Sequence, residues 1–514
     1  MNNLISWYSN GFWLASFALI LWHYFKDKEG WTKLFQFLFV LGISTYAIAF
    51  SFLPNNAGHK LVILSKDLIL MGLISLAFQV LRNYKHLYWL AVFLLYVSSR
   101  LYLSHWQKTL IHETGTLNQE NEWELLVKMN ESESTLHLKE IIEKYQLITT
   151  ASFSMGETDQ TELDNYISIE IPENQEAQLE RIKTEISKNP SVSWVEENDL
   201  TQAIPIIPVE PYKSGFKALT NDPFTDKQWP IELMGWNQVM SLFKSGKILP
   251  AKKARIFILD TGIDGKHEDL AGNYESLDTK FDRDDKGHGT HCAGIAAAMT
   301  NNAIGISSIN PGPEYISVTS IRVLNSFGMG TQRDIINGIL KASDAGASVI
   351  NMSLGGRSLD IGQKAYNEAI AYANQRGAIV VVAAGNDNSD ARGFAPANAV
   401  GVITVSAIDT FKNKSSFSNS VAFIKNKIAA PGVNIYSTIP NNQYAAFNGT
   451  SMAAPYVSGL VGLMKSIRPG LTTSEVYDIL VQTGTTSLSP ETTGQIVHAG
   501  KAIEKLVEGN SSGQ

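Results

Sequence analysis

Long stretches without a charged side chain occupy the first part of the chain, and they limit what it can fold into. Residues 4–25 and 34–53 contain no Asp, Glu, Lys or Arg, and shorter charge-free runs follow at 68–81 and 87–99. A helix of about 20 apolar residues crosses the hydrocarbon core of a membrane. Buried helices of a soluble domain would keep polar faces, and these runs have almost none. The sequence therefore predicts a transmembrane region over residues 1–105.

The first two charge-free runs reach spanning length outright, and the two shorter runs reach it when they are extended. Extended in this way, they predict four helices at about 4–25, 33–53, 61–81 and 86–103. The third helix must then include Lys66 and Asp67, which could pair or face a neighbouring helix. A cleaved signal peptide is disfavoured, since no basic start precedes Leu4 and no small-residue cleavage site follows the first run.

The basic residues of the short loops predict the orientation of these helices. The first loop carries Lys26, Lys28 and Lys33, and the third carries Arg82 and Lys85. Loops rich in Lys and Arg stay in the cytoplasm. Both ends of this multi-pass region, and all that follows it, are therefore expected outside the cytoplasm.

The composition of the whole chain excludes several classes of protein. The single cysteine, Cys292, rules out an intrachain disulfide framework and a multi-cysteine metal site. The 514 residues include 42 Lys and Arg against 49 Asp and Glu, a formal charge of −7. A nucleic-acid-binding protein would show a basic excess or stripe, and neither is present. We therefore expect no nucleic-acid partner.

Residues 122–204 have the pattern of a small α+β module. Its strand candidates are WELLVKM, NYISIEI and VSWVEEN, and its helix candidates are 136–146 and 174–188. The order β-α-β-β-α-β is typical of a ferredoxin-like fold. From these residues alone it could be any small regulatory or binding module.

Residues 222–508, after a linker rich in proline, alternate short β-rich runs with helical segments. The strand candidates are ARIFILD, YISVTSIRVL, ASVINMSL, GAIVVVAAGN and GVITVSAI. Continuous apolar strands separated by helices indicate an α/β fold with a parallel sheet covered on both faces. In such folds chemistry gathers at the carboxyl ends of the strands.

Two motifs of this region carry candidate acid–base residues. Asp260 in ILDTGID directly follows an apolar strand. Aspartic proteases use the same Asp-Thr-Gly, but they need two copies and this chain has one. His288 lies between Gly287 and Gly289, and the small residues that follow suit a buried helix. A zinc site at His288 is disfavoured because no HExxH pattern is present.

Two further motifs carry a candidate nucleophile and a candidate hydrogen-bond donor. Ser451 in NGTSMAAP opens a long apolar helix, whose N-terminus offers free N–H groups and a partial positive charge. Either could stabilise an oxyanion, although an isolated Ser there is more often a helix cap. Asn386 in VVVAAGND ends a strand and could donate into a cleft or form a turn.

Together, the order Asp-His-Asn-Ser with these flanks closely resembles the subtilisin-like serine proteases, whose triad follows the same order. The resemblance covers residues 222–508 and includes NDPFTDKQWPIELM, the HEDL after Asp260 and the SLGG at 353–356. Cys292 beside the histidine motif suggests the thermitase-like or proteinase K-like branch. The fold implied is a subtilisin-like parallel sheet covered by helices.

The resemblance implies a role for each motif. Ser451 attacks the scissile carbonyl, His288 transfers the proton, and Asp260 holds the histidine. Asn386 and the Ser451 N–H form the oxyanion hole. An extended peptide binds between two edges, with a small apolar pocket that suits a hydrophobic residue before the cleaved bond. The substrate-binding residues implied are Gly328, Met329, Gly330, Ser353, Leu354, Gly355, Gly356, Ala383, Ala384 and Gly385.

The resemblance also implies a structural calcium ion. Carboxylate, amide and carbonyl oxygens suit this hard cation. The matching positions are Asp222, Asp269, Met299, Asn302, Ile304 and Ile306. A second calcium at Asp282, Asp284 and Asp285 is a weaker expectation, since this loop is shorter than its family equivalent.

The 122–204 module resembles the inhibitor-like prodomain of these proteases, which assists folding and then occupies the cleft until it is cut. The family's cut would fall near Ile204, but Pro205 follows and is a poor leaving group. Cleavage is therefore expected later, between Ser214 and Thr220. Such a cut would release the catalytic domain from the membrane.

The sequence thus predicts a membrane-anchored zymogen of a subtilisin-like serine endopeptidase. Its partners would be protein or peptide substrates, its own prodomain as inhibitor, and the lipid membrane. The alternative is a catalytically idle peptide-binding or regulatory protein on the same scaffold, which the intact motif residues argue against. A sensor or channel-like role for the four helices has no strong intramembrane polar array to favour it.

Overall fold

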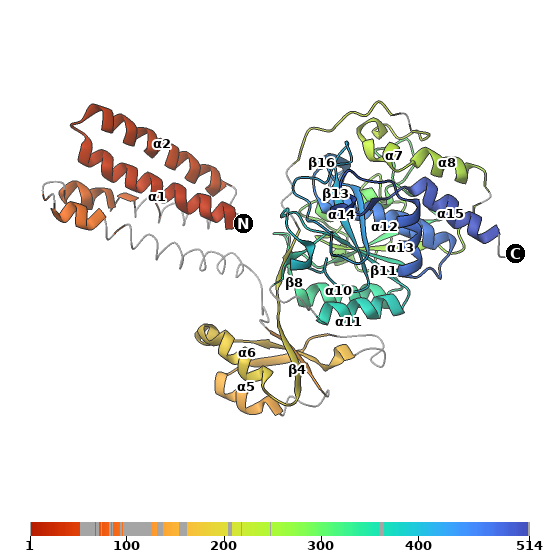
Figure 1. The fold of residues 1–514 in the computed structure, drawn as a ribbon, viewed down its shortest axis with the longest axis horizontal. Helices are drawn as coiled ribbons and strands as arrows, with labels where there is room; N and C mark the ends of the chain where they lie inside the picture. The colour runs from red at the N-terminus through yellow and green to blue at the C-terminus, as the bar shows by residue number, and fades with distance from the viewer. Residues whose placement is uncertain are drawn as a thin grey trace. The chain divides into compact units, whose positions relative to one another are not determined.

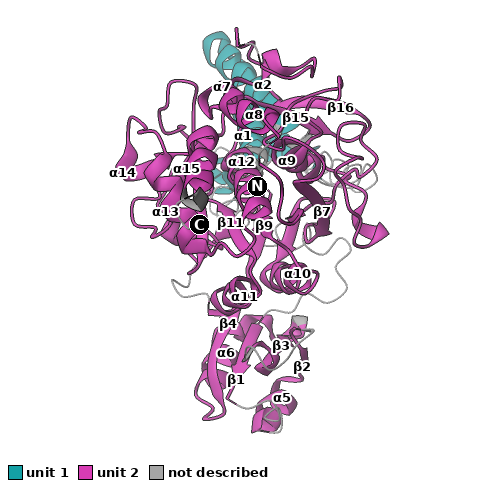
Figure 2. Ribbon diagram, turned by 90° about the vertical axis from the view of Figure 1, so that its right-hand side faces the viewer, with its two compact units in different colours: residues 1–121 teal, residues 122–514 magenta. Residues whose placement is uncertain are grey.

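The computed structural model divides into two compact units, residues 1–121 and 122–514 (Figure 2). It describes residues 2–51, 67, 71–72, 74–81, 84, 86–92, 95, 125–130, 137–153, 162–203, 208–216, 218–246, 248–358 and 364–511.

Two long helices lie side by side in the first unit, α1 (Asn2–Phe25) and α2 (Glu29–Ser51) (Figure 1). Glycine permits their close approach: a Cβ on Gly11 would come 2.5 Å from Tyr46 N, and one on Gly42 would come 2.5 Å from Ala15 N. Small residues commonly allow such backbone contact between apolar helices. These helices coincide with the first two predicted spans. The predicted spans at 61–81 and 86–103 lie partly outside the described residues, of which 74–81 and 86–92 are helical.

One stretch of α2 has the length and apolar character needed to cross a membrane. Among the described residues, the stretch that meets both conditions is Glu29–Ile48, which has a mean hydropathy of 1.3. Only 17% of its most apolar part is buried. A signal sequence near an N-terminus has the same character. The structure therefore supports an apolar N-terminal helix, and the four-pass arrangement remains a prediction.

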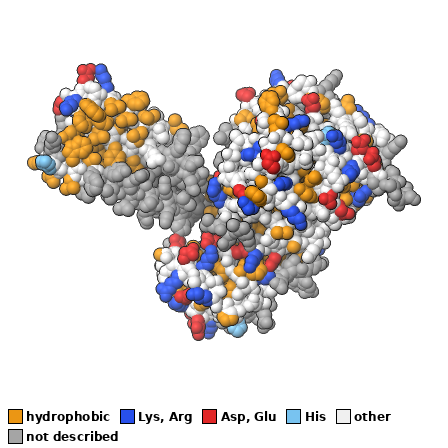
Figure 3. All heavy atoms as spheres, viewed as in Figure 1, with side chains coloured by type: hydrophobic (Ala, Val, Ile, Leu, Met, Phe, Trp, Pro, Cys, Tyr) orange, Lys and Arg blue, Asp and Glu red, His pale blue; other side chains and the backbone are white. Residues whose placement is uncertain are grey.

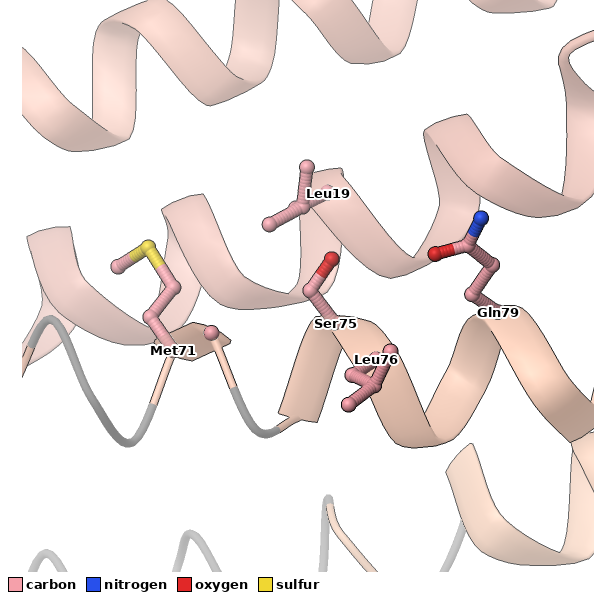
Figure 4. A pocket seen from close by; sticks show the side chains of 6 residues that line it. Leu19, Met71, Ser75, Leu76 and Gln79 are labelled. Carbon is pink, nitrogen blue, oxygen red and sulfur yellow. The ribbon is translucent and has the colours of Figure 1, made fainter.

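Polar side chains in the first unit pair with one another. His23 Nε2 lies 3.1 Å from Ser75 Oγ, and the Tyr46 hydroxyl donates to Asp67 Oδ2 at 2.9 Å. A hollow beside α1 is lined by Leu19, Met71, Gly72, Ser75, Leu76 and Gln79 (Figure 4). Pairing of this kind lowers the cost of polar groups among apolar helices.

The second unit begins with a four-stranded antiparallel sheet in the order β2-β3-β1-β4. Its elements are β1 (Leu125–Met129), α5 (Lys139–Tyr145), β2 (Ile148–Ala151), β3 (Tyr166–Glu170), α6 (Leu179–Ser187) and β4 (Val192–Glu197). Their order is the predicted β-α-β-β-α-β, although β2 matches none of the three strand candidates named from the sequence. Ile182 and Ile186 of α6 are fully buried in the core beneath the sheet.

The centre of the second unit is a seven-stranded parallel sheet in the order β17-β14-β13-β11-β9-β6-β7. The strands are β6 (Ala254–Asp260), β7 (Ile316–Arg322), β9 (Val349–Met352), β11 (Ile379–Ala383), β13 (Val402–Ile408), β14 (Lys427–Pro431) and β17 (Gln495–Ile496). The five strands predicted from sequence are all present, and the prediction of an α/β fold with a parallel sheet is confirmed. No strand was predicted at β14 or β17.

Both faces of this sheet are buried, as its continuous apolar strands predicted. Within β6, Ile256 and Ile258 join one hydrophobic cluster, and Phe257 and Leu259 join another. The first cluster includes side chains of α9 and α12, and the second includes side chains of α10 and α11 (Figure 2). The main helices are α9 (His288–Ala297), α10 (Gln332–Asp344), α11 (Lys364–Gln375), α12 (Thr450–Ile467), α13 (Thr473–Thr483) and α15 (Ala499–Ser511).

Short elements complete the second unit. The helices are α7 (Trp229–Leu233), α8 (Trp236–Lys244) and α14 (Pro490–Thr493), with 3-10 turns at Glu162–Asn165, Glu173–Gln178, Thr225–Lys227, Thr279–Phe281 and Ala391–Gly393. The paired strands are β5 (Leu200–Gln202) with β8 (Met329–Thr331), β10 (Gly356–Arg357) with β12 (Phe394–Ala395), and β15 (Ile435–Ile439) with β16 (Gln443–Phe447). The β5–β8 pair joins segments that are far apart in the sequence.

Candidate active site

Asp260 and His288 form a buried pair at the carboxyl edge of the sheet. Asp260 is the last residue of β6, and His288 is the first residue of α9. His288 Nδ1 lies 2.8 and 2.9 Å from the two Asp260 carboxylate oxygens. Burial acts to lower the pKa of His288, but the Asp260 charge and hydrogen bond outweigh it and raise that pKa.

Glycines bring the two elements together. A Cβ on Gly289 would lie 2.1 Å from the carbonyl oxygen of Gly262, so a larger residue would push α9 away from the end of β6. Gly287 precedes the helix with a φ of 84°, which glycine adopts without strain. The two glycines that flank His288 therefore allow α9 to approach the end of β6 closely.

Asp284 fixes the start of α9, a role that sequence reasoning missed. Its Oδ1 accepts the N–H groups of Lys286 and Gly287 at 3.0 and 2.8 Å and the Thr261 hydroxyl at 2.8 Å. Its Oδ2 accepts the N–H and hydroxyl of Thr290 at 2.9 and 2.7 Å. These bonds order the loop that precedes α9, and the weaker expectation of a second calcium ion at Asp282, Asp284 and Asp285 remains a prediction. An acidic residue just before a helix was the available signal.

Ser451, near the start of α12, is held against the same region. Its hydroxyl donates to the Ser353 carbonyl at 3.0 Å, and its carbonyl accepts from Ser353 Oγ at 2.8 Å and Cys292 Sγ at 3.4 Å. The Cys292 sulfur lies within 4.8 Å of ligand atoms of both Asp260 and His288. Ser451 therefore adjoins the Asp260–His288 pair, with its hydroxyl turned toward Ser353 rather than bonded to His288.

One polar atom of His288 and one of Asn386 are buried and have no hydrogen-bond partner: His288 Nε2 and Asn386 Nδ2. Asn386 Oδ1 accepts both the N–H and the hydroxyl of Thr450 at 2.9 Å, which fixes the direction of the amide. A Cβ on Gly449 would lie 3.3 Å from Asn386 Nδ2 and 3.6 Å from Ser451 N, so both donors border one small space. An unpaired buried polar group costs about 1–3 kcal/mol. Such atoms are typical of a site that awaits a ligand.

The second histidine of the motif, His291, has a structural environment. It stacks on Phe447 with ring centroids 4.2 Å apart, and its Nε2 lies 3.1 Å from the Ala445 carbonyl oxygen. Burial lowers its pKa to about 3, so it is neutral at ordinary pH.

The two predicted peptide-binding edges hold a segment of the chain itself. Ala203 N–H donates to the Gly328 carbonyl at 2.8 Å. On the other side, Gln202 and Gly355 exchange N–H donors at 3.3 Å in each direction. The described residues Leu200–Ala203 therefore lie extended between the 328–330 edge and the 353–355 edge.

The predicted side chains of the specificity pocket are deeply buried. Leu354, Ala383 and Ala384 are 2%, 4% and 0% exposed, and they belong to three different hydrophobic clusters. Gly385 follows them with a φ of 98°. Because these side chains do not pack in one common cluster, their assignment to a single specificity pocket remains a prediction.

The predicted calcium residues gather around two carboxylates. Asp222 Oδ1 accepts the Asn302 N–H at 3.0 Å, and Asp269 accepts from Asn302 Nδ2 at 3.0 Å and Ile306 N at 2.8 Å. Met299 N–H donates to the Asp269 carbonyl, while Ile304 N–H donates to Asn302 Oδ1. Burial, with the neighbouring charge of Asp222 as a smaller cause, raises the pKa of Asp269 to about 7. Two adjoining carboxylates with an amide oxygen suit a hard cation.

The chain is similar to several known proteins. The family model described as "Subtilase family" matches residues 251–500. The chain is 37% identical over 310 residues to the "Thermophilic serine proteinase" of Bacillus sp. (strain AK1), covering 59% of this chain and 70% of the relative. It is 44% identical over 218 residues to "Thermitase" of Thermoactinomyces vulgaris, covering 41% of this chain and 75% of the relative. A solved structure of proteases from Pseudoalteromonas arctica PAMC 21717 aligns with a TM-score of 0.49 and 29% identity, over 56% of this chain and 100% of that one. The chain belongs to the subtilase family of serine endopeptidases.

Proposed function

We propose that the chain is a membrane-anchored, subtilisin-like serine endopeptidase made as a zymogen, with Asp260, His288 and Ser451 as its catalytic triad. The observation that carries the proposal is the pair of buried, unpartnered atoms His288 Nε2 and Asn386 Nδ2, of which the Asn386 amide borders the same small space as Ser451 N. One atom can accept the serine proton, and the other can bind the oxyanion.

The chemistry follows from the positions of these atoms. Rotation about the Ser451 Cα–Cβ bond would turn the hydroxyl from Ser353 toward His288 Nε2. His288 takes the proton as Oγ attacks the peptide carbonyl, and Asp260 stabilises the resulting imidazolium. The carbonyl electrons move to the oxygen, which accepts from Asn386 Nδ2 and the Ser451 N–H. The C–N bond then breaks as His288 returns the proton to the leaving amine, and water completes the hydrolysis.

Replacing Asn386 with leucine is expected to lower kcat about 100- to 1000-fold and to change KM little, because the donor acts on charge that develops in the transition state. Steady-state kinetics on a peptide substrate measure kcat and KM separately. A rise in KM at unchanged kcat would instead indicate that Asn386 binds the ground state.

The 122–204 module would be the inhibitory prodomain of this zymogen. Its β5 strand occupies the two edges expected to bind substrate. Behind β5, the buried carboxylate of Glu196 accepts from Gln332 Nε2 at 3.0 Å and from the N–H groups of Lys364 and Ala365 at 2.8 and 3.2 Å. Lys128, 4% exposed, also pairs with Glu368 at 2.7 Å. These contacts support a module that docks firmly on α10 and α11.

Replacing Glu196 with alanine is expected to raise the basal peptide hydrolysis of the full chain about 100-fold. Loss of a buried charged acceptor with several donors weakens docking by about 3 kcal/mol. The matched control is Glu180→Ala, which alters an exposed residue of α6. Equal hydrolysis by wild type and Glu196→Ala would contradict the inhibitory role.

Maturation would not occur near Ile204, because Pro205 follows it. Both residues lie outside the described part of the chain. The later interval from Ser214 to Thr220 contains exposed positions such as Gly215 and Leu219, which supports a cut there. Intact-mass analysis of wild type beside Ser451→Ala locates the cut. A fragment that begins at Pro205 in wild type would overturn this assignment.

The first unit would anchor the enzyme in a membrane. Large apolar side chains of α2 are exposed, as lipid contact would require, and Figure 3 shows such side chains gathered on this unit. They include Trp31, Leu34, Phe37, Val40, Leu41 and Ile48. The four-pass proposal places the peptidase outside the cytoplasm. A reporter fused after residue 514 tests it, and a cytoplasmic reporter would contradict it.

A structural calcium ion would neutralise Asp222 and Asp269. Their hydrogen-bond partners among the described residues are N–H groups and one hydroxyl, so no charge balances them there. Chelation is expected to lower Tm by about 5–10 °C. Differential scanning calorimetry measures this shift. Asp269→Asn should abolish the fall in Tm on chelation. The control Asp478→Asn, on the exposed face of α13, should retain it. An equal fall in Tm in both variants would place the ion elsewhere.

A further inference from the structure

A second segment of the chain, residues 208–216, docks on the edge of strand β16. The Val209 N–H donates to the Ala446 carbonyl at 3.0 Å, and the two residues form an antiparallel bridge. Ala446 is also paired with Tyr436 of β15. Because a strand residue has one neighbour on each side, Val209 lies on the edge of β16 that faces away from β15.

The side chain of Asn434, just before β15, holds the next residues of this segment. Its Oδ1 accepts the Tyr212 N–H at 2.7 Å, and its Nδ2 donates to the Glu210 carbonyl at 2.7 Å. The side chains of Glu210 and Tyr212 are exposed. We call the edge of β16 at Ala446, together with the Asn434 amide, the docking strip. Its hydrogen bonds reach only backbone atoms of the segment, so it can hold an extended chain with little demand on sequence.

The docking strip adjoins the loop that carries the candidate nucleophile. Ala446 and Asn448 both lie shortly before Ser451 in the sequence. The Asn434 N–H donates to Asn448 Oδ1 at 2.6 Å, which ties the strip to this loop. A chain bound on the strip is therefore held close to Ser451.

The chain occupies the substrate edges and the docking strip in the order that a substrate would. Residues 200–203 lie between the two substrate edges, and Val209 follows on the strip. Between them in sequence, Pro208 lines a hollow together with Gly287, which directly precedes His288. A substrate bound in the same direction would place the residues after its cleaved bond on the strip.

We propose that the docking strip binds the part of a substrate that follows the cleaved bond, so that the mature enzyme favours long, unfolded polypeptides over short peptides. The inference rests on the proposed function, including a maturation cut between Ser214 and Thr220 that lets residues 208–213 leave the strip. The edge of β16 and the Asn434 amide would then need new partners, and an extended chain supplies them through its backbone. A short peptide ends before it reaches the strip and gains none of these bonds.

The contact is tested without catalysis, by hydrogen exchange of the Tyr212 amide in the full chain carrying Ser451→Ala. Asn434 has a φ of 55°, so Asn434→Gly removes the side chain without backbone strain. This change is expected to speed exchange about tenfold. The matched control is Asn441→Gly, at an exposed position with a φ of 67° in the turn between β15 and β16. An unchanged rate in Asn434→Gly, or an equal rise in both variants, would overturn the inference.

The selectivity is tested on enzyme matured from the full chain, with active sites counted by a fluorophosphonate. Two substrates share the same sequence around the cleaved bond, and only one continues for about ten residues beyond it, enough to reach the strip. The kcat/KM ratio is expected to favour the long substrate about tenfold in wild type and in Asn441→Gly, and to approach one in Asn434→Gly. A second long substrate with an unrelated sequence after the bond should behave like the first.

The outcomes separate this inference from the proposed function. Titratable enzyme that cleaves the short and long substrates at equal rates would overturn the inference and leave the proposed function standing. The same holds for a preference for the long substrate that Asn434→Gly leaves unchanged. Folded protein without titratable sites would contradict the proposed function, and the inference would fall with it.

Discussion

Replacing Asp260 with asparagine is expected to lower kcat by about four orders of magnitude while the fold is kept. Both carboxylate oxygens of Asp260 lie within 2.9 Å of His288 Nδ1, so Nδ1 carries the proton and Nε2 is free to accept one. An asparagine amide that donates to Nδ1 would move the ring proton to Nε2. His288 could then no longer accept the Ser451 proton.

The pH dependence gives this variant a second readout. Hydrolysis requires neutral His288, so wild-type activity should rise with pH through the pKa of His288, which Asp260 raises. Without that charge, burial dominates and lowers this pKa. The rising limb of kcat/KM should therefore move to lower pH in Asp260→Asn. An unchanged limb would show that another group controls the profile.

Replacing Ser451 with alanine is expected to lower kcat about a million-fold, the largest effect of any single change. Only the hydroxyl is lost. The backbone carbonyl of Ser451 keeps its hydrogen bonds from Ser353 and Cys292, so the start of α12 should stay in place. The matched control is Ser466→Ala on the same helix, whose hydroxyl bonds only within that helix, to the Leu463 carbonyl. Single-turnover kinetics compare the rates of the two variants. A similarly large fall in the rate of Ser466→Ala would indicate that such substitutions disturb the fold, and that the effect of Ser451→Ala does not report loss of the nucleophile.

The main sheet could be predicted because its strands are long and apolar. The run ARIFILD corresponds residue for residue to β6, whose two faces are both buried. β17 is only two residues long and carries no periodic signal, so it was missed. Strand β5 was also missed, because its pairing with β8 depends on how the small module docks and not on the local sequence.

The functional groups of the candidate site could be predicted from the sequence, but not all of the residues that orient them. Asp260 ends a strand, Asn386 follows one, and His288 and Ser451 lie at the starts of helices, which the sequence patterns indicate. The orientation of Asn386 by Thr450, and the capping of α9 by Asp284, depend on side-chain contacts. The Asn386–Thr450 contact joins residues 64 apart in the chain, and no spacing rule anticipates it. The contact of Asp284 with Thr290 is local, and its signal was the acidic residue before the helix.

The central claim is that Ser451 is a nucleophile activated by His288, and a serine-directed fluorophosphonate probe with peptide mapping tests it most directly. The full chain and its Glu196→Ala variant are labelled, so that docking of the prodomain does not hide the site. We predict one adduct, on Ser451, absent from Ser451→Ala and formed far more slowly by Asp260→Asn. Folded protein that stays unlabelled in both forms, or that carries the adduct on another residue, would contradict the account.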